Sequence, residues 1–393
     1  MQPLEVMGRI AQTVRACFYS PEKLIVPSIQ KPQRVRRVPR ALPSRFKRQR
    51  VLIIGCGDVG QRTARLWRPM ERRISMELPG GAQSISADVP DLIAEKGAQP
   101  HHRLPLVRAL TSSPEKCAAL RAQGILPLQG NLDDAASLRR LAGLAQRVVH
   151  LAPPAAIAST EGETVASVLD QRTRHLLRAL VRRANSAPAL VYGSTSGVYG
   201  DWQGAWVDEA RPLRATTARA LRRVDAESQL RGWALRFQDS GARVHVLRIP
   251  GIYAGDCEGG TPVARLLRGT PALRAEDDVF TSHIHADDLA RAVALALWRG
   301  KPQRATNVAD DSALRMGDYF DLAAELWQLP RPPRISRAEA AQQLSPVLLS
   351  FMSESRRVAN RRMKAELGLK LRYPTVQQGL AAAFQLSKDL PKK

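Results

Sequence analysis

The sequence predicts an α/β fold, in which a doubly wound parallel sheet is followed by a smaller C-terminal lobe. Between residues 50 and 250, short apolar runs of strand length alternate with segments of helical character, which is typical of a parallel sheet with helices on both faces. The first of these strands runs into a glycine-rich turn that opens a helix. Past Gly251 the alternation ends and helical segments dominate, so we expect the rest of the chain to form a separate lobe.

The first strand and its turn, RVLIIGCGDVG, are the segment around which this fold is built. Val51–Ile54 form an apolar run typical of a strand buried on both faces, and residues 61–67 indicate a helix. The glycines have GxGxxG spacing, in which Gly55 allows the tight turn, Gly57 lets the backbone approach a pyrophosphate and Gly60 lets helix and strand pack closely. The helix N-terminus offers free N–H groups to the phosphates. We therefore expect a dinucleotide that contacts Gly55, Gly57, Asp58, Val59 and Gly60.

The following segments continue the alternation. Strands are expected at residues 106–110, 125–128, 147–151 and 189–192, and helices at 114–123, 134–142 and 164–184. Ligands of such sheets lie beyond the carboxyl ends of the strands. The residues that follow the strands are therefore further candidates for contact with the cofactor: Thr111, Ser112, Asn131, Leu132, Ala152 and Ser194.

Three regions follow from this pattern. Residues 1–49 form a strongly basic segment, which we interpret as a disordered tail or an extension from an upstream start codon, although its Arg-rich, acid-poor composition also suits a transit peptide. Residues 50–250 are expected to form the sheet domain, with an inserted loop at 69–104 that is rich in Pro and Gly and lacks periodicity. Residues 251–385 are expected to form the mostly helical substrate-binding lobe.

Composition limits the classes of function. The chain of 393 residues has a net charge of +24, with 44% apolar and 24% charged residues. Much of the positive charge lies in the first 50 residues and the remainder is spread out with few aromatic residues, so we do not expect nucleic acid as the main partner. The four cysteines form no CxxC pair and no metal-ligand spacing, which predicts neither a disulfide framework nor a metal site and suits a reducing cytoplasm. No apolar run approaches the ~20 residues that span a membrane.

Further motifs appear in order along the chain. They are STSGVYG at 194–200, DEARPL at 208–213, VLRIPGIYA at 246–254, HADDLA at 285–290, NVAD at 307–310 and KAELGLKLRYPTVQQGL at 364–380. With the glycine turn, they make the chain similar to the extended short-chain dehydrogenase/reductase (SDR) family, of the NAD-dependent epimerase/dehydratase type, over residues 50–380 without the insertion. This resemblance implies a Rossmann-type fold, NAD(P) as the cofactor and a small-molecule substrate.

The chain departs from that family at its catalytic residues. Members of the family use a Ser or Thr with a Tyr-xxx-Lys pair, and Thr195 matches the first of these. Arg219 stands near the Tyr position and Arg223 at the Lys position, and no tyrosine lies between Tyr199 and Tyr253, which resembles the atypical SDR subgroup. Arginine cannot shuttle a proton near neutral pH. We therefore expect Arg223 to hydrogen-bond ribose or phosphate, and Arg219 either to clamp an anionic substrate or to be an exposed helix residue.

The residues at the end of the second strand indicate whether the cofactor is NAD or NADP. An NAD site usually has an Asp or Glu there, which binds the ribose 2′-hydroxyl, whereas this chain has Thr111–Ser113 and no acid. Small hydroxyl side chains in basic surroundings could receive a 2′-phosphate, so the sequence favours NADP over NAD. His283 and His285 have side chains suited to acid–base work, but the resemblance implies a structural role for both.

The sequence therefore predicts an NAD(P)-dependent oxidoreductase or epimerase-like enzyme that acts on a small metabolite, and the basic lobe suggests that this metabolite is anionic. The alternative is a catalytically degenerate NAD(P)-binding protein that serves as a sensor or interaction protein. The missing tyrosine favours the alternative, whereas Thr195 and the intact lobe favour the enzyme. We expect no membrane partner, and a homodimer is left open.

Overall fold

The computed structural model describes residues 48–68, 104–155, 168–181 and 186–389. The basic tail up to residue 47, nearly all of the predicted insertion at 69–104 and the ends of the helix expected at 164–184 lie outside these described residues. The predictions made for those segments stay predictions.

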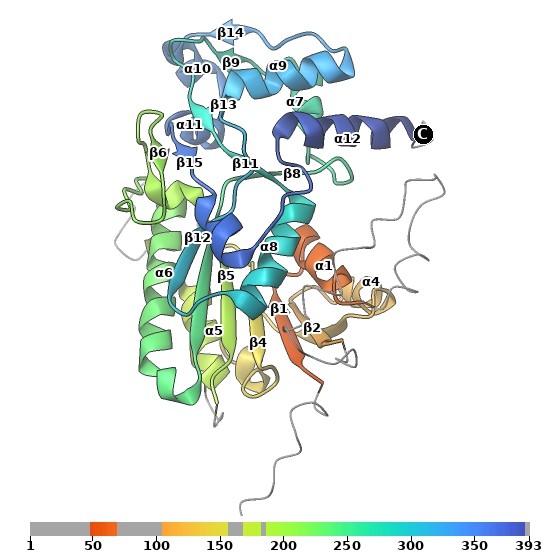
Figure 1. Cartoon of the computed structure of the whole chain (residues 1–393), viewed down its shortest axis with the longest axis vertical. Coiled ribbons are helices and arrows are strands. Elements are labelled where there is room, and N and C mark those ends of the chain that lie inside the picture. Colours follow the sequence, from red (N-terminus) through yellow and green to blue (C-terminus); the bar gives the residue numbers. More distant parts are fainter. Residues whose placement is uncertain (1–47, 69–103, 156–167, 182–185, 390–393) are drawn as a thin grey trace, which may run out of the picture. The chain divides into compact units, whose positions relative to one another are not determined.

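A seven-stranded, all-parallel sheet organises the described chain, which confirms the predicted doubly wound α/β fold (Figure 1). Its strand order is β12-β7-β5-β4-β1-β2-β3. Strand β1 lies between β2 and β4, with Ile54 opposite Leu110 on one side and His150 on the other. The strands are β1 (Arg50–Ile54), β2 (Leu106–Thr111), β3 (Leu126–Gln129), β4 (Arg147–His150), β5 (Ala189–Thr195), β7 (Arg243–Ile249) and β12 (Arg304–Asn307).

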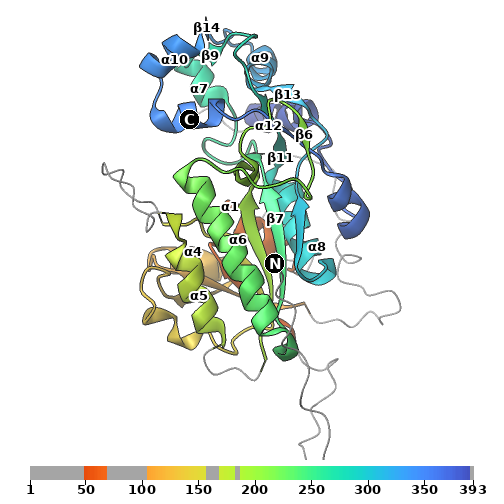
Figure 2. The same ribbon diagram turned by 90° about the vertical axis from the view of Figure 1, so that its left-hand side faces the viewer.

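The alternation of side chains along β1 explains the layers on both faces of the sheet. Val51 and Ile53 point into one hydrophobic cluster, and Leu52 and Ile54 point into another on the opposite face. Helices α1 (Asp58–Arg65) and α8 (Ala286–Arg299) contribute to the first cluster, and α5 (Gln171–Val181) and α6 (Ala218–Arg236) to the second (Figure 2). A strand buried on both faces therefore has an unbroken apolar sequence.

One local element differs from the sequence-based expectation on the β3 side of the sheet. Helix α4 (Lys116–Ala122) forms as predicted, but the helix expected at 134–142 is only the 3₁₀ turn η2 (Ser137–Arg140). The Ser137 hydroxyl accepts a hydrogen bond from the backbone N–H of Asn131 and donates to the carbonyl oxygen of Asp134. Such side-chain bonds compete with the helical backbone pattern. The turn ends at Arg140, and Gly143, at φ +71°, has a left-handed conformation through which a helix does not continue.

The lobe after the main sheet combines short helices with pairs of very short strands. Its helices are α7 (Val263–Leu267), α9 (Met316–Trp327), α10 (Arg337–Gln343), α11 (Pro346–Met352) and α12 (Val376–Asp389). The two-stranded pairs are β10 (Phe280–Thr281) with β13 (Leu314–Arg315), β11 (His283–His285) with β8 (Gly251–Tyr253), β14 (Arg334–Ile335) with β9 (Ala272–Leu273), and β15 (Arg357–Val358) with β6 (Trp206–Val207). The sequence did not predict these pairs, since two- and three-residue strands carry no periodicity.

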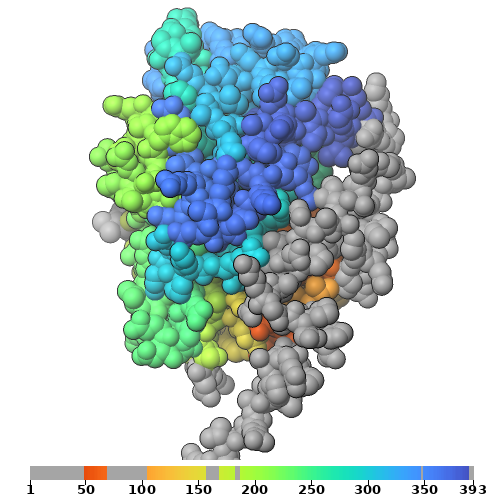
Figure 3. Space-filling model, in the orientation of Figure 1, coloured from red at the N-terminus to blue at the C-terminus, as the bar shows by residue number. Residues whose placement is uncertain are grey.

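The chain crosses between lobe and sheet more often than a boundary at residue 250 implies. After residue 250 it returns to the sheet with α8 and β12, the latter pairing with β7. It returns again after β15, where Met363 and Leu367 join the cluster on the α8 face; in Figure 3 this blue segment lies at the centre of the face shown. Whether residues 50–250 and 251–385 are separate domains therefore stays a prediction.

The arginine-rich sequence of residues 353–367 predicts a helix over this segment, and this prediction is wrong for residues 353–360. The segment forms β15 followed by the π-helical turn Met363–Leu367. The Ser355 carbonyl accepts hydrogen bonds from the backbone N–H groups of Trp202 and Gly204, and Arg357 pairs with Trp206 in the β15–β6 ladder. These long-range backbone bonds override the local helix propensity.

Candidate active site at the carboxyl edge of the sheet

Three cavities lie at the carboxyl edge of the sheet, around the ends of β1 to β5. The β2-side cavity, of about 550 Å³, is lined by the glycine turn and by residues that follow β2, β3 and β4. The central cavity, of about 500 Å³, is lined by the same turn, the end of β5 and the segment 257–260. The lobe cavity, of about 500 Å³, joins the end of β5 to the lobe. This is the position at which doubly wound sheets bind their ligands.

Each predicted cofactor residue lines one of the first two cavities. Gly55 and Gly57 line both, Thr111, Ser112, Asn131, Leu132 and Ala152 line the β2-side cavity, and Asp58, Val59, Gly60 and Ser194 line the central one. The structure thus brings together residues from the ends of five strands, β1 to β5, as the sequence predicted. That these residues contact a cofactor stays a prediction.

The three glycines of the turn have different surroundings. Gly55 has φ +83°, and a Cβ there would lie 2.4 Å from the backbone nitrogen of Ala152. At Gly60 a Cβ would lie 3.0 Å from the carbonyl oxygen of Gly55 and 3.3 Å from Ile53 Cγ2, so α1 packs closely on β1. At Gly57 a Cβ would meet nothing within 4 Å. Gly55 and Gly60 are therefore required by the fold, whereas the open space beside Gly57 fits a pyrophosphate at the start of α1.

The side chain of Asp58 is engaged within the protein. Its carboxylate accepts from Arg62 Nε at 2.9 Å, and Arg62 also pairs with Asp287, at 2.6 Å, and with Asp256. The three carboxylates raise the pKa of the buried Arg62 guanidinium above its usual range, against the opposing effect of burial. This cluster fixes α1 against α8 and against the segment that borders the central cavity. Because the Asp58 carboxylate is bound to Arg62, only the backbone of Asp58 is available to a ligand.

The β2-side cavity has a basic and polar lining. No Asp or Glu is among the residues that line it, whereas Lys116, at the start of α4, is. Thr111 Oγ1 accepts from the backbone N–H of Ser113 at 3.2 Å, which fixes the turn after β2. Arg172 also borders the cavity, but it pairs with Asp133 at 2.6 Å. Lys116 was missed by the sequence analysis, although it stands three residues after the turn.

A buried ion pair holds the end of β5. Ser194 Oγ donates to Glu227 Oε1 at 2.7 Å, and Arg248 Nη2 donates to Glu227 Oε2 at 2.8 Å. Arg248 also donates to the hydroxyl of Tyr199, which in turn donates to Asn307 Oδ1 at 2.7 Å. The Ser194 hydroxyl therefore points toward this network, and α6, β7 and β12 are tied to the strand that carries the candidate catalytic residue.

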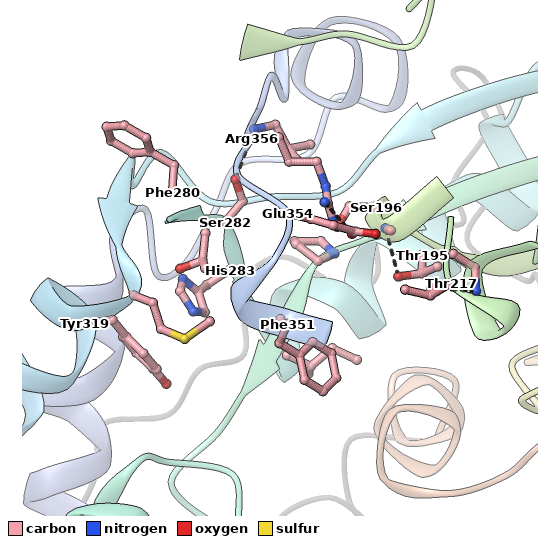
Figure 4. A pocket seen from close by; sticks show the side chains of 18 of the residues that line it. Thr195, Ser196, Thr217, Phe280, Ser282, His283, Tyr319, Phe351, Glu354 and Arg356 are labelled. Carbon is pink, nitrogen blue, oxygen red and sulfur yellow. Dashed lines mark hydrogen bonds and ion pairs between the residues drawn. The ribbon is translucent and has the colours of Figure 1, made fainter. Parts of the chain in front are cut away.

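The central and lobe cavities meet at four residues that line both, and Thr195 is the one among them with a hydroxyl group; the others are Pro250, Ile252 and Gly259. Thr195 Oγ1 accepts from the backbone N–H of Gly197 at 3.2 Å, as the N-cap of the turn η4 (Ser196–Tyr199). That bond orients the hydroxyl and leaves its proton available to a ligand (Figure 4).

The two arginines of α6 take different positions. Arg223 lines the central cavity, and its Nη1 donates to the carbonyl oxygen of Gly193 at 2.8 Å and to the hydroxyl of Tyr192 at 3.0 Å. Arg219 lines the lobe cavity, where its guanidinium lies 4.3 Å from the ring centre of Phe351. Burial lowers the pKa of Arg219, and the nearby Arg223 adds to this shift. Arg219 is exposed in its first helical turn, so both predicted roles for it remain open.

The lobe supplies the far wall of the lobe cavity, which the sequence did not identify (Figure 4). Glu354 and Arg356 form an ion pair of 2.7 Å there. His283 stacks on Tyr319 with ring centres 4.3 Å apart, and burial lowers its pKa to about 4. The imidazole is therefore neutral at neutral pH, and its stacking fits the structural role implied by the resemblance.

His285 also has a structural position. Its Nδ1 accepts from the backbone N–H of Asp287 at the start of α8, and its ring stacks on Tyr373. Burial lowers the pKa of His285, although Asp287 and Asp288 oppose this shift. His285 therefore caps a helix.

Metal sites and membrane-spanning helices can be searched for in the described residues. Within them, no three His, Cys, Asp or Glu side chains gather as a metal site would require. Of the helices in the described part of the chain, none is long and apolar enough to cross a membrane.

Comparisons with known proteins agree with this architecture. The model of the NAD dependent epimerase/dehydratase family matches residues 92–309. A 3-diazoavenalumate denitrifying reductase from Streptomyces is 28% identical over 306 residues, which cover 74% of this chain and 94% of that protein. A conserved protein of unknown function from Silicibacter pomeroyi is 27% identical, with a TM-score of 0.58 and coverage of 86% and 99%. MoeE5, solved with UDP-glucose and NAD, is 20% identical, with a TM-score of 0.60 and coverage of 86% and 98%.

Proposed function

Because the chain belongs to the NAD-dependent epimerase/dehydratase family, we propose that it is an NAD(P)-dependent oxidoreductase or epimerase-like enzyme acting on a small anionic metabolite. The observation that carries this proposal is the meeting of the central and lobe cavities at Thr195. A dinucleotide in the first two cavities would end beside Thr195, and a substrate in the lobe cavity would meet it there. The reductase among the relatives supports oxidoreductase chemistry.

Backbone and side-chain groups of the chain would bind the cofactor and orient the substrate. The backbone at Gly57 and the N–H groups of the first turn of α1 would hold the pyrophosphate. Arg223 would donate its remaining N–H groups to ribose or phosphate oxygens, while Nη1 stays bound to the Gly193 carbonyl. When bound, the nicotinamide would accept or supply a hydride. Thr195 would donate its proton to the carbonyl or hydroxyl oxygen of the substrate and so orient it.

Neither arginine can act as the missing tyrosine does in the family. A guanidinium does not release its proton near neutral pH, so we assign Arg219 and Arg223 to binding by charge and hydrogen bonding. Arg219 would pair with an anionic group at the entrance of the lobe cavity.

We further propose that the cofactor is NADP. The β2-side cavity has no carboxylate among its lining residues to accept from a 2′-hydroxyl, and Ser112 and Lys116 both line it. A hydroxyl and an ammonium group suit a 2′-phosphate. Tighter binding of NAD than of NADP would contradict this assignment.

A catalytically degenerate NAD(P)-binding sensor is the second candidate. The observation that favours it is Arg219, which occupies the first turn of α6 where the family's tyrosine is expected. The two candidates agree on the cofactor and differ on hydride transfer.

The experiment that tests the enzyme measures NADPH binding by fluorescence and NADPH oxidation by absorbance, with a panel of small aldehydes and keto acids. For the enzyme, Thr195→Ala should lower turnover about 100-fold or more with the NADPH dissociation constant within about threefold. The matched control Thr195→Ser should retain most of the turnover. NADPH binding without oxidation across the panel would contradict the oxidoreductase and favour the epimerase or the sensor, since an epimerase causes no net oxidation of the cofactor. Absence of NADPH binding would contradict both candidates.

A further inference from the structure

Arg265 is a charged side chain in the wall of the lobe cavity that has no counterion among the described residues. It lies on α7, and its Nη2 is buried without a hydrogen-bond acceptor. Its guanidinium lies 4.7 Å from the ring centre of Phe320. Buried donors are almost always paired in folded proteins, so an unpaired one in the wall of a cavity indicates a binding position.

In the part of the chain that the structure describes, no acidic side chain acts on Arg265 as a counterion. Among the residues that line the lobe cavity, the only acid is Glu354, which pairs with Arg356 at 2.7 Å. The charge that acts most on Arg265 is that of Arg268, and both burial and this like charge lower the pKa of Arg265. A partly buried cation beside a like charge is unfavourable by itself, and an anion would relieve it.

The walls around this cation are aromatic. Phe280, Tyr319, Phe320 and Phe351 all line the lobe cavity, and the Tyr319 ring stacks on that of His283. Aromatic side chains pack best against planar groups, in offset or edge-to-face contact. The cavity therefore combines a cation with surfaces suited to a flat, apolar body.

We propose that the lobe cavity binds an aromatic oxyanion, a carboxylate or a phosphate carried on a planar ring, with the anionic group held by Arg265 and the reacting group directed toward Thr195. This inference rests on the proposed function for its reacting group. It assigns Arg265 as a second residue that selects the charge of the substrate, in addition to Arg219, which lines the same cavity.

The experiment titrates benzoate, phenyl phosphate and the neutral analogue benzyl alcohol into the full-length protein by calorimetry, with and without saturating NADPH. Benzoate or phenyl phosphate should bind at least tenfold more tightly than benzyl alcohol. The tighter of the two shows whether the site prefers a carboxylate or a phosphate. Arg265→Gln should weaken the binding of that probe at least tenfold. Its matched control is Arg268→Gln, which removes the same charge from an exposed residue at the end of the same helix and should change the binding less than threefold.

Several results would overturn the inference. They are equal binding of neutral and anionic probes, unchanged binding in the Arg265→Gln variant, and equal losses in the two glutamine variants, which would indicate a general effect of charge. Thermal unfolding of each variant identifies a folding defect, and Arg265→Lys then provides a second test, since it keeps the charge and should retain part of the affinity. Failure of NADPH to bind would contradict the proposed function, whereas the titrations without NADPH would still decide the anion site.

Discussion

Replacing Gly57 with alanine should separate cofactor binding from folding at the glycine turn. A Cβ at this position meets nothing within 4 Å, and its φ of −78° is ordinary for any residue. The free energy of unfolding should therefore stay the same or rise by up to about 1 kcal/mol, because alanine restricts the unfolded chain. The added methyl group would instead occupy the space in which the pyrophosphate approaches the start of α1.

The loss of affinity can be worked from the bonds displaced. Moving the pyrophosphate away from the turn removes one or two hydrogen bonds to a charged group, each about 1.5 kcal/mol or more. The dissociation constant of NADPH should therefore rise about 10- to 100-fold, since 1.4 kcal/mol corresponds to a factor of ten. Fluorescence titration of NADPH measures this constant, and urea denaturation without cofactor measures the stability.

Gly55→Ala is the contrasting variant on the same turn. Its φ of +83° and the approach of a Cβ to within 2.4 Å of the Ala152 backbone nitrogen should lower the free energy of unfolding by roughly 2 kcal/mol or more. If Gly57→Ala bound NADPH as tightly as the unaltered chain, or if it lost stability as Gly55→Ala does, the assignment of Gly57 to the pyrophosphate would be refuted.

Three other predictions concern the ion pair, the cofactor and pH. Glu227→Gln leaves Arg248 buried without its carboxylate and should lower the free energy of unfolding by about 3–5 kcal/mol, as measured by urea denaturation. The control Arg231→Gln breaks an exposed contact to the same carboxylate and should change the free energy of unfolding by at most about 1 kcal/mol. Equal effects of the two variants would contradict a stabilising role of the buried Glu227–Arg248 pair. Lys116→Gln should weaken NADPH binding about tenfold and leave NADH binding unchanged, and a parallel loss of both would remove Lys116 from recognition of the 2′-phosphate. Burial raises the pKa of Asp310 to about 8. Because the folded state binds the carboxyl proton of Asp310 more tightly than the unfolded chain does, this proton contributes fully to the free energy of unfolding below about pH 4, and the contribution is lost as the pH rises to about 8. The stability of the unaltered chain relative to Asp310→Asn should therefore fall between pH 5 and pH 8, and a constant difference would contradict the shift.

Much of the sheet and its binding edge could be predicted from local patterns. The run Val51–Ile54 is apolar at each position because both faces of β1 are covered, and the glycine spacing reflects contacts within one turn. The strand ends could be placed side by side because parallel strands carry their carboxyl ends to one edge. Thr111, Asn131 and Ala152 therefore line one cavity, as expected.

The lobe and the far wall of the site were not predictable in this way. The pairing of Arg357 with Trp206 joins segments about 150 residues apart, and no local pattern predicts such a contact. Arg265 and His283 line the lobe cavity only because α7 and β11 are brought to the end of β5 by the tertiary fold. In a sequence this rich in arginine, no local pattern predicts which arginines form ion pairs with a carboxylate in the folded protein.

The most direct test of the account is a crystal structure of the protein grown with NADP. The pyrophosphate should lie at Gly57 and the start of α1, the 2′-phosphate beside Ser112 and Lys116, and the nicotinamide at Thr195, facing the lobe cavity. A dinucleotide bound elsewhere, or one with its nicotinamide directed away from Thr195, would contradict the account.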